Sequence, residues 1–220
     1  MFWAVNSSQK KNNHVAAIFI TFEGIDGSGK STQSKILAQS FADQGFDAIL
    51  TREPGGSAGA EDIRKLLVSG ETDRWSPETE ILLFTAARRD HLEKTIQPAL
   101  ANGTIVISDR FADSTRVYQG VARADLRQTV DALHDTIIQT EPDLTFIIDV
   151  DPKHALSRGL ARNSGEDRFE DFGLQFQMDL RAGFLALANE NTNRCHVIDG
   201  NRPIDAIATD VLAIAKAAIA

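Results

Sequence analysis

Nine residues near the start of the chain have the types and spacing of a phosphate-binding loop. They fit the pattern G-x-x-x-x-G-K-[ST] and are Gly24, Ile25, Asp26, Gly27, Ser28, Gly29, Lys30, Ser31 and Thr32. The glycines let backbone N–H groups turn toward phosphate oxygens, and the helix expected next presents its positive end to the same anion. Lys30 supplies a cation for the terminal phosphates, and the Ser31 hydroxyl suits a Mg²⁺ ligand. The sequence therefore predicts a P-loop that binds ATP.

The residues on both sides of this loop fit its expected setting. Residues 15–22 form a continuous apolar run, as in a buried parallel strand, and Ile36, Leu37 and Phe41 recur at helical spacing after the loop. A strand, a glycine-rich loop and a helix in that order distinguish a P-loop from an ordinary glycine-rich turn.

Further strand-like runs alternate with helical patterns along the chain. These runs cover residues 47–51, 104–108, 144–150 and 196–199. Ser76 and Pro77 have the types of an N-cap and a first helical residue, and they predict a helix that ends near Leu100. Apolar stripes within residues 126–138 and 207–219 predict two more helices. This alternation predicts the three-layer α/β fold of P-loop NTPases, a parallel five-stranded sheet with helices on both faces.

Charged residues follow the second and third expected strands. Ligands of such a sheet bind beyond the carboxyl ends of its strands, so Arg52, Asp109 and Arg110 should gather beside the P-loop. Two arginines together with Lys30 describe a site for more than one phosphate group. Asp109 ends an apolar strand, where P-loop proteins place the carboxylate that holds Mg²⁺ directly or through water. The alternative is that Asp109 only caps the next turn.

Two other segments could complete the site. Phe84 and Arg88 lie four residues apart on one face of the helix expected from Ser76, so a ring and a guanidinium could read a flat base. Read alone, Phe84 would belong to the core and Arg88 to a solvated face. The polar stretch 158–168 holds three arginines, and as a lid it could bring Arg158 or Arg162 onto the transferring phosphoryl group. The alternative is a solvated basic loop.

The composition limits the class of protein. The chain has 220 residues, of which 42% are hydrophobic, and this is enough for one α/β domain with a proper core. The net charge of −8 argues against binding of a nucleic-acid backbone, which needs a basic footprint. Cys195 is the only cysteine, which suits a reducing cytoplasm, and no apolar run is long enough to predict a membrane span. Residues 1–14 are expected to be a disordered extension.

Taken together, these motifs resemble the thymidylate kinase family from about Phe19 to the final helix. The segments that carry the resemblance are residues 22–27, 51–56, 83–88, 109–111, 118–120 and 142–145. The run Arg-Glu-Pro-Gly-Gly at 52–56 is the most discriminating, because generic P-loop kinases lack it. A signalling GTPase is disfavoured, because the chain has no Asn-Lys-x-Asp motif for reading guanine.

The resemblance implies a role for several residues at the acceptor site. Asp26 would lie near the deoxyribose 3′-hydroxyl, and Arg52 and Arg110 would grip the acceptor phosphate. Phe84 would stack on thymine, and Arg88 would donate a hydrogen bond to a carbonyl oxygen of the base.

Further roles follow from the same resemblance. Gln119 would contact the base or a bridging water, and Phe111 would crowd the 2′ position of the sugar, where the family often has tyrosine. The P-loop offers only Lys30 as a cation, so the chain resembles the bacterial type in which the lid supplies the catalytic arginine. That residue would be Arg162 or Arg158.

The resemblance also implies the reaction and the partners. The chain would transfer a phosphoryl group from Mg-ATP to dTMP, giving dTDP for dTTP synthesis, and would act as a cytoplasmic homodimer without nucleic-acid or membrane partners. Residues 15–220 would form a single nucleoside monophosphate kinase domain with its lid near 158–168. Another P-loop nucleoside or nucleotide kinase is the alternative.

Overall fold

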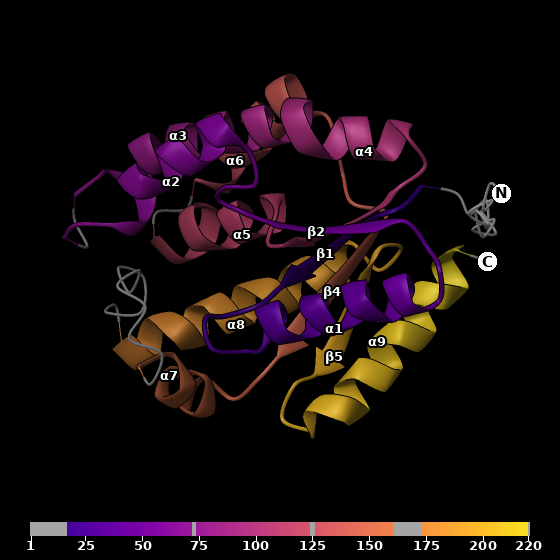
Figure 1. Cartoon of the computed structure of the whole chain (residues 1–220). Coiled ribbons are helices and arrows are strands. Elements are labelled where there is room, and N and C mark those ends of the chain that lie inside the picture. The colour runs from indigo at the N-terminus through magenta and orange to yellow at the C-terminus, as the bar shows by residue number, and fades with distance from the viewer. Residues whose placement is uncertain (1–16, 72–73, 124–125, 161–172, 220) are drawn as a thin grey trace, which may run out of the picture.

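The computed structural model describes residues 17–71, 74–123, 126–160 and 173–219 (Figure 1). Within these residues, five parallel strands form one sheet in the order β2-β3-β1-β4-β5, which confirms the predicted α/β fold. The strands are β1 (Phe19–Glu23), β2 (Ala48–Arg52), β3 (Ile105–Asp109), β4 (Leu144–Asp149) and β5 (Cys195–Asp199). The expected extension at 1–14 lies outside the described residues.

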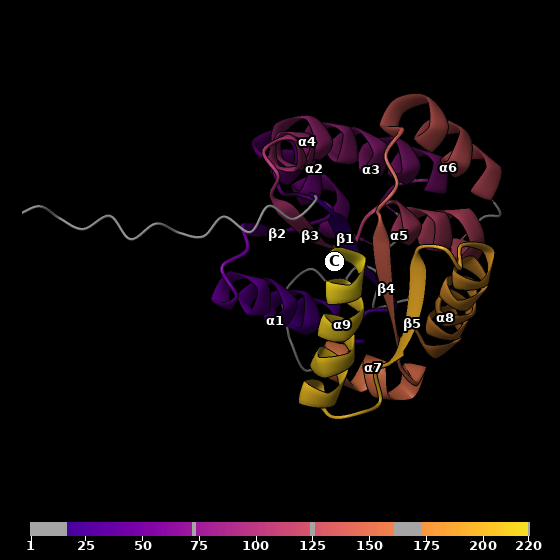
Figure 2. The ribbon, with the colours of Figure 1, turned by 90° about the vertical axis from the view of Figure 1, so that its right-hand side faces the viewer.

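Helices connect the strands and cover both faces of the sheet. They are α1 (Lys30–Asp43), α2 (Ala58–Val68), α3 (Pro77–His91), α4 (Gln97–Ala101), α5 (Ala112–Val117), α6 (Arg127–Leu133), α7 (Pro152–Leu160), α8 (Gly173–Glu190) and α9 (Ile204–Ile219), with π-helical turns η1 (Leu92–Ile96), η2 (Tyr118–Arg123) and η3 (His134–Ile138). Figure 2 shows α1 and α9 on one side of the strands, and α5 and α8 on the other. Among the described helices, none has the length and apolarity needed to cross a bilayer.

The helix predicted from Ser76 to about Leu100 is confirmed as α3, η1 and α4 in continuous succession. The Ser76 side chain accepts a hydrogen bond from the Thr79 N–H and caps the helix start, as its sequence predicts. The π-helical turn precedes Pro98, whose missing N–H interrupts the α-helical hydrogen-bond pattern.

The core holds β1 at the centre of the sheet and fixes this long helix against it. All five residues of β1 are buried, as their continuous apolar run predicts for a parallel strand covered on both faces. A second buried cluster joins Phe19 and Val106 of the sheet to Leu92 and Ile96 of η1. This packing holds η1 against the amino-terminal halves of β1 and β3, while His91 at the end of α3 is hydrogen-bonded to Thr51 and Glu53 at the carboxyl end of β2.

Candidate active site

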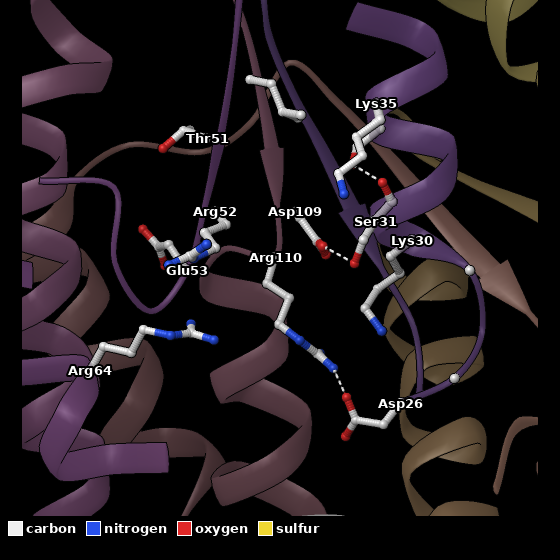
Figure 3. A pocket seen from close by; sticks show the side chains of 14 residues that line it. Asp26, Lys30, Ser31, Lys35, Thr51, Arg52, Glu53, Arg64, Asp109 and Arg110 are labelled. Atoms are coloured by element: carbon white, nitrogen blue, oxygen red, sulfur yellow. Dashed lines mark hydrogen bonds and ion pairs between the residues drawn. The ribbon is translucent and has the colours of Figure 1, made fainter. Parts of the chain in front are cut away.

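A cavity of about 430 Å³ opens at the carboxyl ends of β1, β2 and β3 (Figure 3). A parallel sheet directs the loops after these strands to one edge, so residues far apart in sequence meet there. The predicted site residues that line the cavity are Asp26, Gly27, Gly29, Lys30, Ser31, Arg52, Asp109 and Arg110. Their side chains carry several cations on opposite walls of one cavity, an arrangement suited to phosphate groups.

The P-loop between β1 and α1 follows a path that only glycine permits at two positions. A Cβ at Gly24 would lie 2.6 Å from the Ile148 carbonyl oxygen, and one at Gly27 would lie 2.1 Å from the Ala155 carbonyl oxygen. Both glycines also have positive φ, at 134° and 76°. Lys30 folds back over this loop and donates to the Ile25 carbonyl oxygen at 2.7 Å. Burial lowers the pKa of Lys30 to about 8, and bound phosphates would raise it again.

Ser31 and Asp109 bring oxygen atoms together at the start of α1. The Ser31 hydroxyl donates to Asp109 Oδ2, and the buried Asp109 Oδ1 has no hydrogen-bond partner among the described residues. A buried carboxylate oxygen without a donor, beside a hydroxyl, suits an oxygen-seeking cation such as Mg²⁺. These two residues therefore fit the metal site predicted for them.

Arg110, which follows β3, lines the same cavity as Lys30 and is held in an unusual backbone conformation. Its φ of 74° is rare for a residue with a side chain. The guanidinium Nη2 donates to Asp26 at 2.5 Å and to the Tyr118 hydroxyl at 3.2 Å, while Nη1 donates to Ser114 at 2.8 Å. Burial alone would raise the pKa of Asp26, but Arg110 and Lys30 lower it below its usual value. The pair is therefore ionised and oriented before any ligand binds.

Arg52, at the end of β2, is an exposed cation of the cavity wall. Its Nη2 pairs with Glu61 of α2 at 3.2 Å, and Glu61 also accepts the Gly56 N–H at 3.0 Å. Glu61 thus fixes both the arginine and the glycine-rich turn that follows it.

Arg88 lies behind the cavity and is buried, so the alternative of a solvated face is wrong. Its Nε donates to Glu53 at 2.7 Å, and its Nη2 donates to the Phe111 carbonyl oxygen and the Thr115 hydroxyl, each at 3.1 Å. Glu53 in turn accepts from His91 Nδ1 at 3.0 Å and lines the cavity. These bonds leave Nη1 of Arg88 as the part of the guanidinium without a hydrogen-bond partner among the described residues.

Phe84 and Gln119 do not line the cavity but contact or belong to α3, the helix that carries Arg88. Phe84 is half-buried one helical turn before Arg88, which is compatible with core packing or with one face open to a ligand. Gln119 is buried, and its amide donates to Glu80 Oε2 at 3.0 Å.

The expected contact between the Phe111 ring and a sugar is wrong. Phe111 is 1% exposed, and its ring packs edge-on against Phe19 with the centroids 4.9 Å apart. The positive φ of Arg110 turns the chain, so the next side chain enters the core instead of the cavity. The aromatic residue beside the cavity is Tyr118, whose hydroxyl donates to Asp26 at 2.7 Å.

The lid candidates are only partly within the described residues. Arg162 lies outside them. Arg158 lies near the end of α7, and only its backbone is described. Their proposed catalytic role stays a prediction.

Other residues that surround the site were not predicted. Lys35 and Arg64 line the cavity, and Figure 3 shows both side chains directed into it. Glu23 and Tyr118 do not line the cavity. Glu23 accepts a hydrogen bond from Phe111, next to Arg110, and Tyr118 donates one to Asp26, the partner of Arg110. Lys35 lies one helical turn after Ser31, and helical side chains lean toward the N-terminus, so its position could have been predicted.

Comparison with known proteins decides the family. The family model described as thymidylate kinase matches residues 22–211. This chain belongs to the thymidylate kinase family. It is 70% identical to the thymidylate kinase of Dinoroseobacter shibae, over 88% of this chain and 94% of that protein. It is 62% identical to the thymidylate kinase of Ruegeria pomeroyi, over 90% of this chain and 93% of that protein.

A solved structure agrees with this family assignment. The crystal structure of thymidylate kinase from Ehrlichia chaffeensis superposes with a TM-score of 0.75 at 38% identity, and the match covers 91% of this chain and 99% of that one. As a member of the thymidylate kinase family, the chain is an ATP-using phosphotransferase, and the cavity with its opposed cations is its candidate active site.

Proposed function

We propose that this chain transfers the γ-phosphoryl group of ATP to dTMP, giving dTDP and ADP for dTTP synthesis. The carrying observation is that the P-loop cation Lys30 and the arginines Arg52 and Arg110 line one cavity. A phosphate oxygen of dTMP attacks the γ-phosphorus, a new P–O bond forms, and the bond to the β-phosphate oxygen breaks. Membership of the thymidylate kinase family supports this choice of reaction.

The donor half of the reaction rests on the P-loop. Lys30 neutralises charge on the transferring group, and the backbone N–H groups of the loop hold the ATP phosphates. Ser31 and Asp109 would hold Mg²⁺, which supplies further neutralisation of the phosphate charge when bound.

The acceptor half rests on residues from three other segments. Arg52 and Arg110 hold the acceptor phosphate in line with the donor. Asp26, fixed by Arg110 and Tyr118, is placed to accept a hydrogen bond from the sugar 3′-hydroxyl. Arg88 would donate from its remaining Nη1 to a carbonyl oxygen of thymine, beside Phe84 and Gln119.

The experiment that tests this function is a coupled assay of ADP formation with dTMP, dUMP, AMP, CMP and GMP as acceptors. We expect the highest kcat/KM with dTMP. If dTMP is no better than AMP, CMP or GMP, the alternative of another P-loop nucleotide kinase replaces this proposal. The assay also measures the preference between dTMP and dUMP.

A lid arginine would supply the second catalytic cation. Phosphoryl transfer spreads negative charge over the moving group and is accelerated by an added cation. We expect Arg162→Ala to lower kcat by about a hundredfold, judged from arginine fingers, with little effect on dTMP affinity. A normal Arg162→Ala with an impaired Arg158→Ala would move the role to Arg158.

The remaining expectations concern the whole protein. We propose one nucleoside monophosphate kinase domain over residues 15–220 that acts in the cytoplasm as a homodimer. Exposed apolar side chains on the adjacent helices α2 and α3, Leu66 and Leu82, support an apolar contact between copies. Light scattering of the purified chain tests the dimer, since a monomeric mass at micromolar concentration would contradict it.

A further inference from the structure

Glu23, the last residue of β1, is a fully buried carboxylate to which neither the P-loop motif nor the reaction assigns a role. Its Oε1 accepts the backbone N–H of Phe111 at 2.7 Å, and its Oε2 accepts the Ser114 hydroxyl at 2.6 Å. Both donors belong to the segment that follows Arg110. A buried carboxylate with two donors is a strong local constraint, because charge-assisted hydrogen bonds are stronger than neutral ones.

The first of these bonds fixes the backbone of Arg110. The Arg110 N–H donates to the Phe22 carbonyl oxygen at 2.9 Å, and its carbonyl oxygen accepts from Ser108 at 2.7 Å. Glu23 accepts the N–H of the next residue, Phe111, so the backbone of Arg110 is held by hydrogen bonds on both sides. A left-handed conformation costs free energy for any residue other than glycine, so Arg110 would leave it without such bonds.

The second bond fixes the guanidinium of Arg110. The Ser114 hydroxyl has one hydrogen, and it is directed to Glu23. Its lone pairs therefore face the other way, where Arg110 Nη1 donates to it at 2.8 Å. Glu23 thereby sets the direction of the Ser114 hydroxyl, and that hydroxyl orients Arg110 toward the cavity.

We propose that Glu23 is a positioning residue for the acceptor phosphate, acting through Phe111 N–H and Ser114 on Arg110. This inference rests on the proposed function, because it takes Arg110 as a residue that binds the acceptor phosphate. Glu23 itself does not line the cavity, so its effect on dTMP is indirect.

The electrostatic surroundings of Glu23 agree with a constrained role. Burial and the nearby Asp113 raise the pKa of Glu23 to about 7, whereas Arg110 and the two hydrogen bonds favour its charged form. Asp113 is itself paired with Arg116 at 2.8 Å and Arg194 at 2.6 Å. Glu23 is therefore left with Phe111 and Ser114 as its hydrogen-bond donors, which matches a dedicated positioning contact.

The test compares steady-state kinetics of the full chain with Glu23→Gln, Ser114→Ala and the double variant. The glutamine keeps an acceptor for the Phe111 N–H but points an amide N–H₂ at Ser114, so the hydroxyl can no longer donate there. We expect the KM for dTMP to rise about tenfold in each single variant, as for loss of one charged hydrogen bond. The KM for ATP should stay within about twofold of wild type, since the P-loop is untouched.

Asp143→Asn is the matched control. Asp143 Oδ2 accepts the Phe19 N–H at 2.7 Å, so it too is a carboxylate that accepts a backbone N–H, but at the opposite end of β1 from Glu23. We expect this variant to leave both KM values unchanged. If it raises the KM for dTMP as Glu23→Gln does, the effect is a general consequence of loosening β1 and the proposal is overturned.

The double variant tests the path through Ser114. If Glu23 acts through this hydroxyl, the double variant should be no worse than Glu23→Gln alone, and multiplicative losses would overturn the relay. If Glu23→Gln does not fold, Ser114→Ala must still show the selective rise in KM for dTMP. If the wild type phosphorylates dTMP but the variants keep its KM for dTMP, this inference alone is overturned. If the wild type is inactive on dTMP, the proposed function is overturned as well.

Discussion

Replacement of Arg88 by alanine should have two separable effects, one on stability and one on dTMP binding. The side chains of Arg88 and Glu53 are each only 4% exposed, and Nε lies 2.7 Å from Oε2. Arg88→Ala therefore leaves a buried carboxylate whose remaining partner is His91. Breaking a buried ion pair costs about 3–5 kcal/mol in the free energy of unfolding. For a chain of this size that is a fall in Tm of about 6–20 °C.

The effect on dTMP comes from a different atom. Nε and Nη2 are used by Glu53, Phe111 and Thr115, so Nη1 is the donor left for the base. A charged hydrogen bond in a buried site contributes about 1.5–3 kcal/mol. The dissociation constant for dTMP should therefore rise about tenfold or more, and that for ATP should not change.

A second substitution separates the two effects. Glu53→Gln in the Arg88→Ala background removes the stranded charge, so it should recover most of the lost stability, measured by denaturant or thermal unfolding. It cannot restore the donor to the base, so calorimetry should still find weak dTMP binding. If the double variant recovers stability and dTMP affinity together, Arg88 affects binding only through the fold, and the assignment to the base is refuted.

Three further predictions concern other charged groups. Lys30→Ala should abolish turnover but leave dTMP binding intact by calorimetry, and loss of both would contradict the division into donor and acceptor halves. Lys35→Ala should raise the KM for ATP about twofold to fivefold at low salt and less at high salt. The reason is that Lys35 is exposed, lines the cavity and has no ion pair with the described residues. The control is Lys65→Ala, on α2 outside the cavity lining, which should leave the KM for ATP unchanged. The pKa of Glu23 is raised from 4.5 to about 7 on folding, so its contribution to stability is fully present below pH 4.5 and is lost as the pH rises to about 7. Glu23→Gln should remove this pH dependence, which amounts to about 3 kcal/mol in the free energy of unfolding between about pH 4 and pH 8, and denaturant titrations at these two pH values measure it.

Local sequence patterns were sufficient for the sheet and the P-loop. The central strands β1, β3 and β4 are continuous apolar runs because they are buried on both faces, and the P-loop is one contiguous motif. The edge strands β2 and β5 were also predicted from apolar residues, although Leu50 and Val197 in them are exposed. Helices were predicted less completely. The helix α5 has six residues, too few for a periodic pattern. The predicted helices also omit α8, although Phe176, Leu180, Phe184 and Leu187 repeat there at helical spacing.

The side-chain partners of the site could not be predicted in this way. Whether Arg88 faces solvent or Glu53 depends on how α3 packs against the loop after β2, 35 residues away in sequence. The direction of Phe111 depends on the positive φ of Arg110, which no residue type at that position signals. Glu23 looks like the polar end of a strand until the turn after β3 brings its two donors onto it.

The pairing of cations with carboxylates explains how a chain of net charge −8 can bind two polyanions. Arg110 is held by Asp26, Arg88 by Glu53 and Arg52 by Glu61, so the three arginines that we propose for the acceptor side are oriented before the substrate arrives. Orientation in advance removes part of the entropy cost of binding. A guanidinium has five N–H donors, so one carboxylate does not exhaust it, and a phosphate or a carbonyl can bind to the rest. Lys30 instead rests on a neutral carbonyl oxygen, which leaves its full charge available to the donor phosphates.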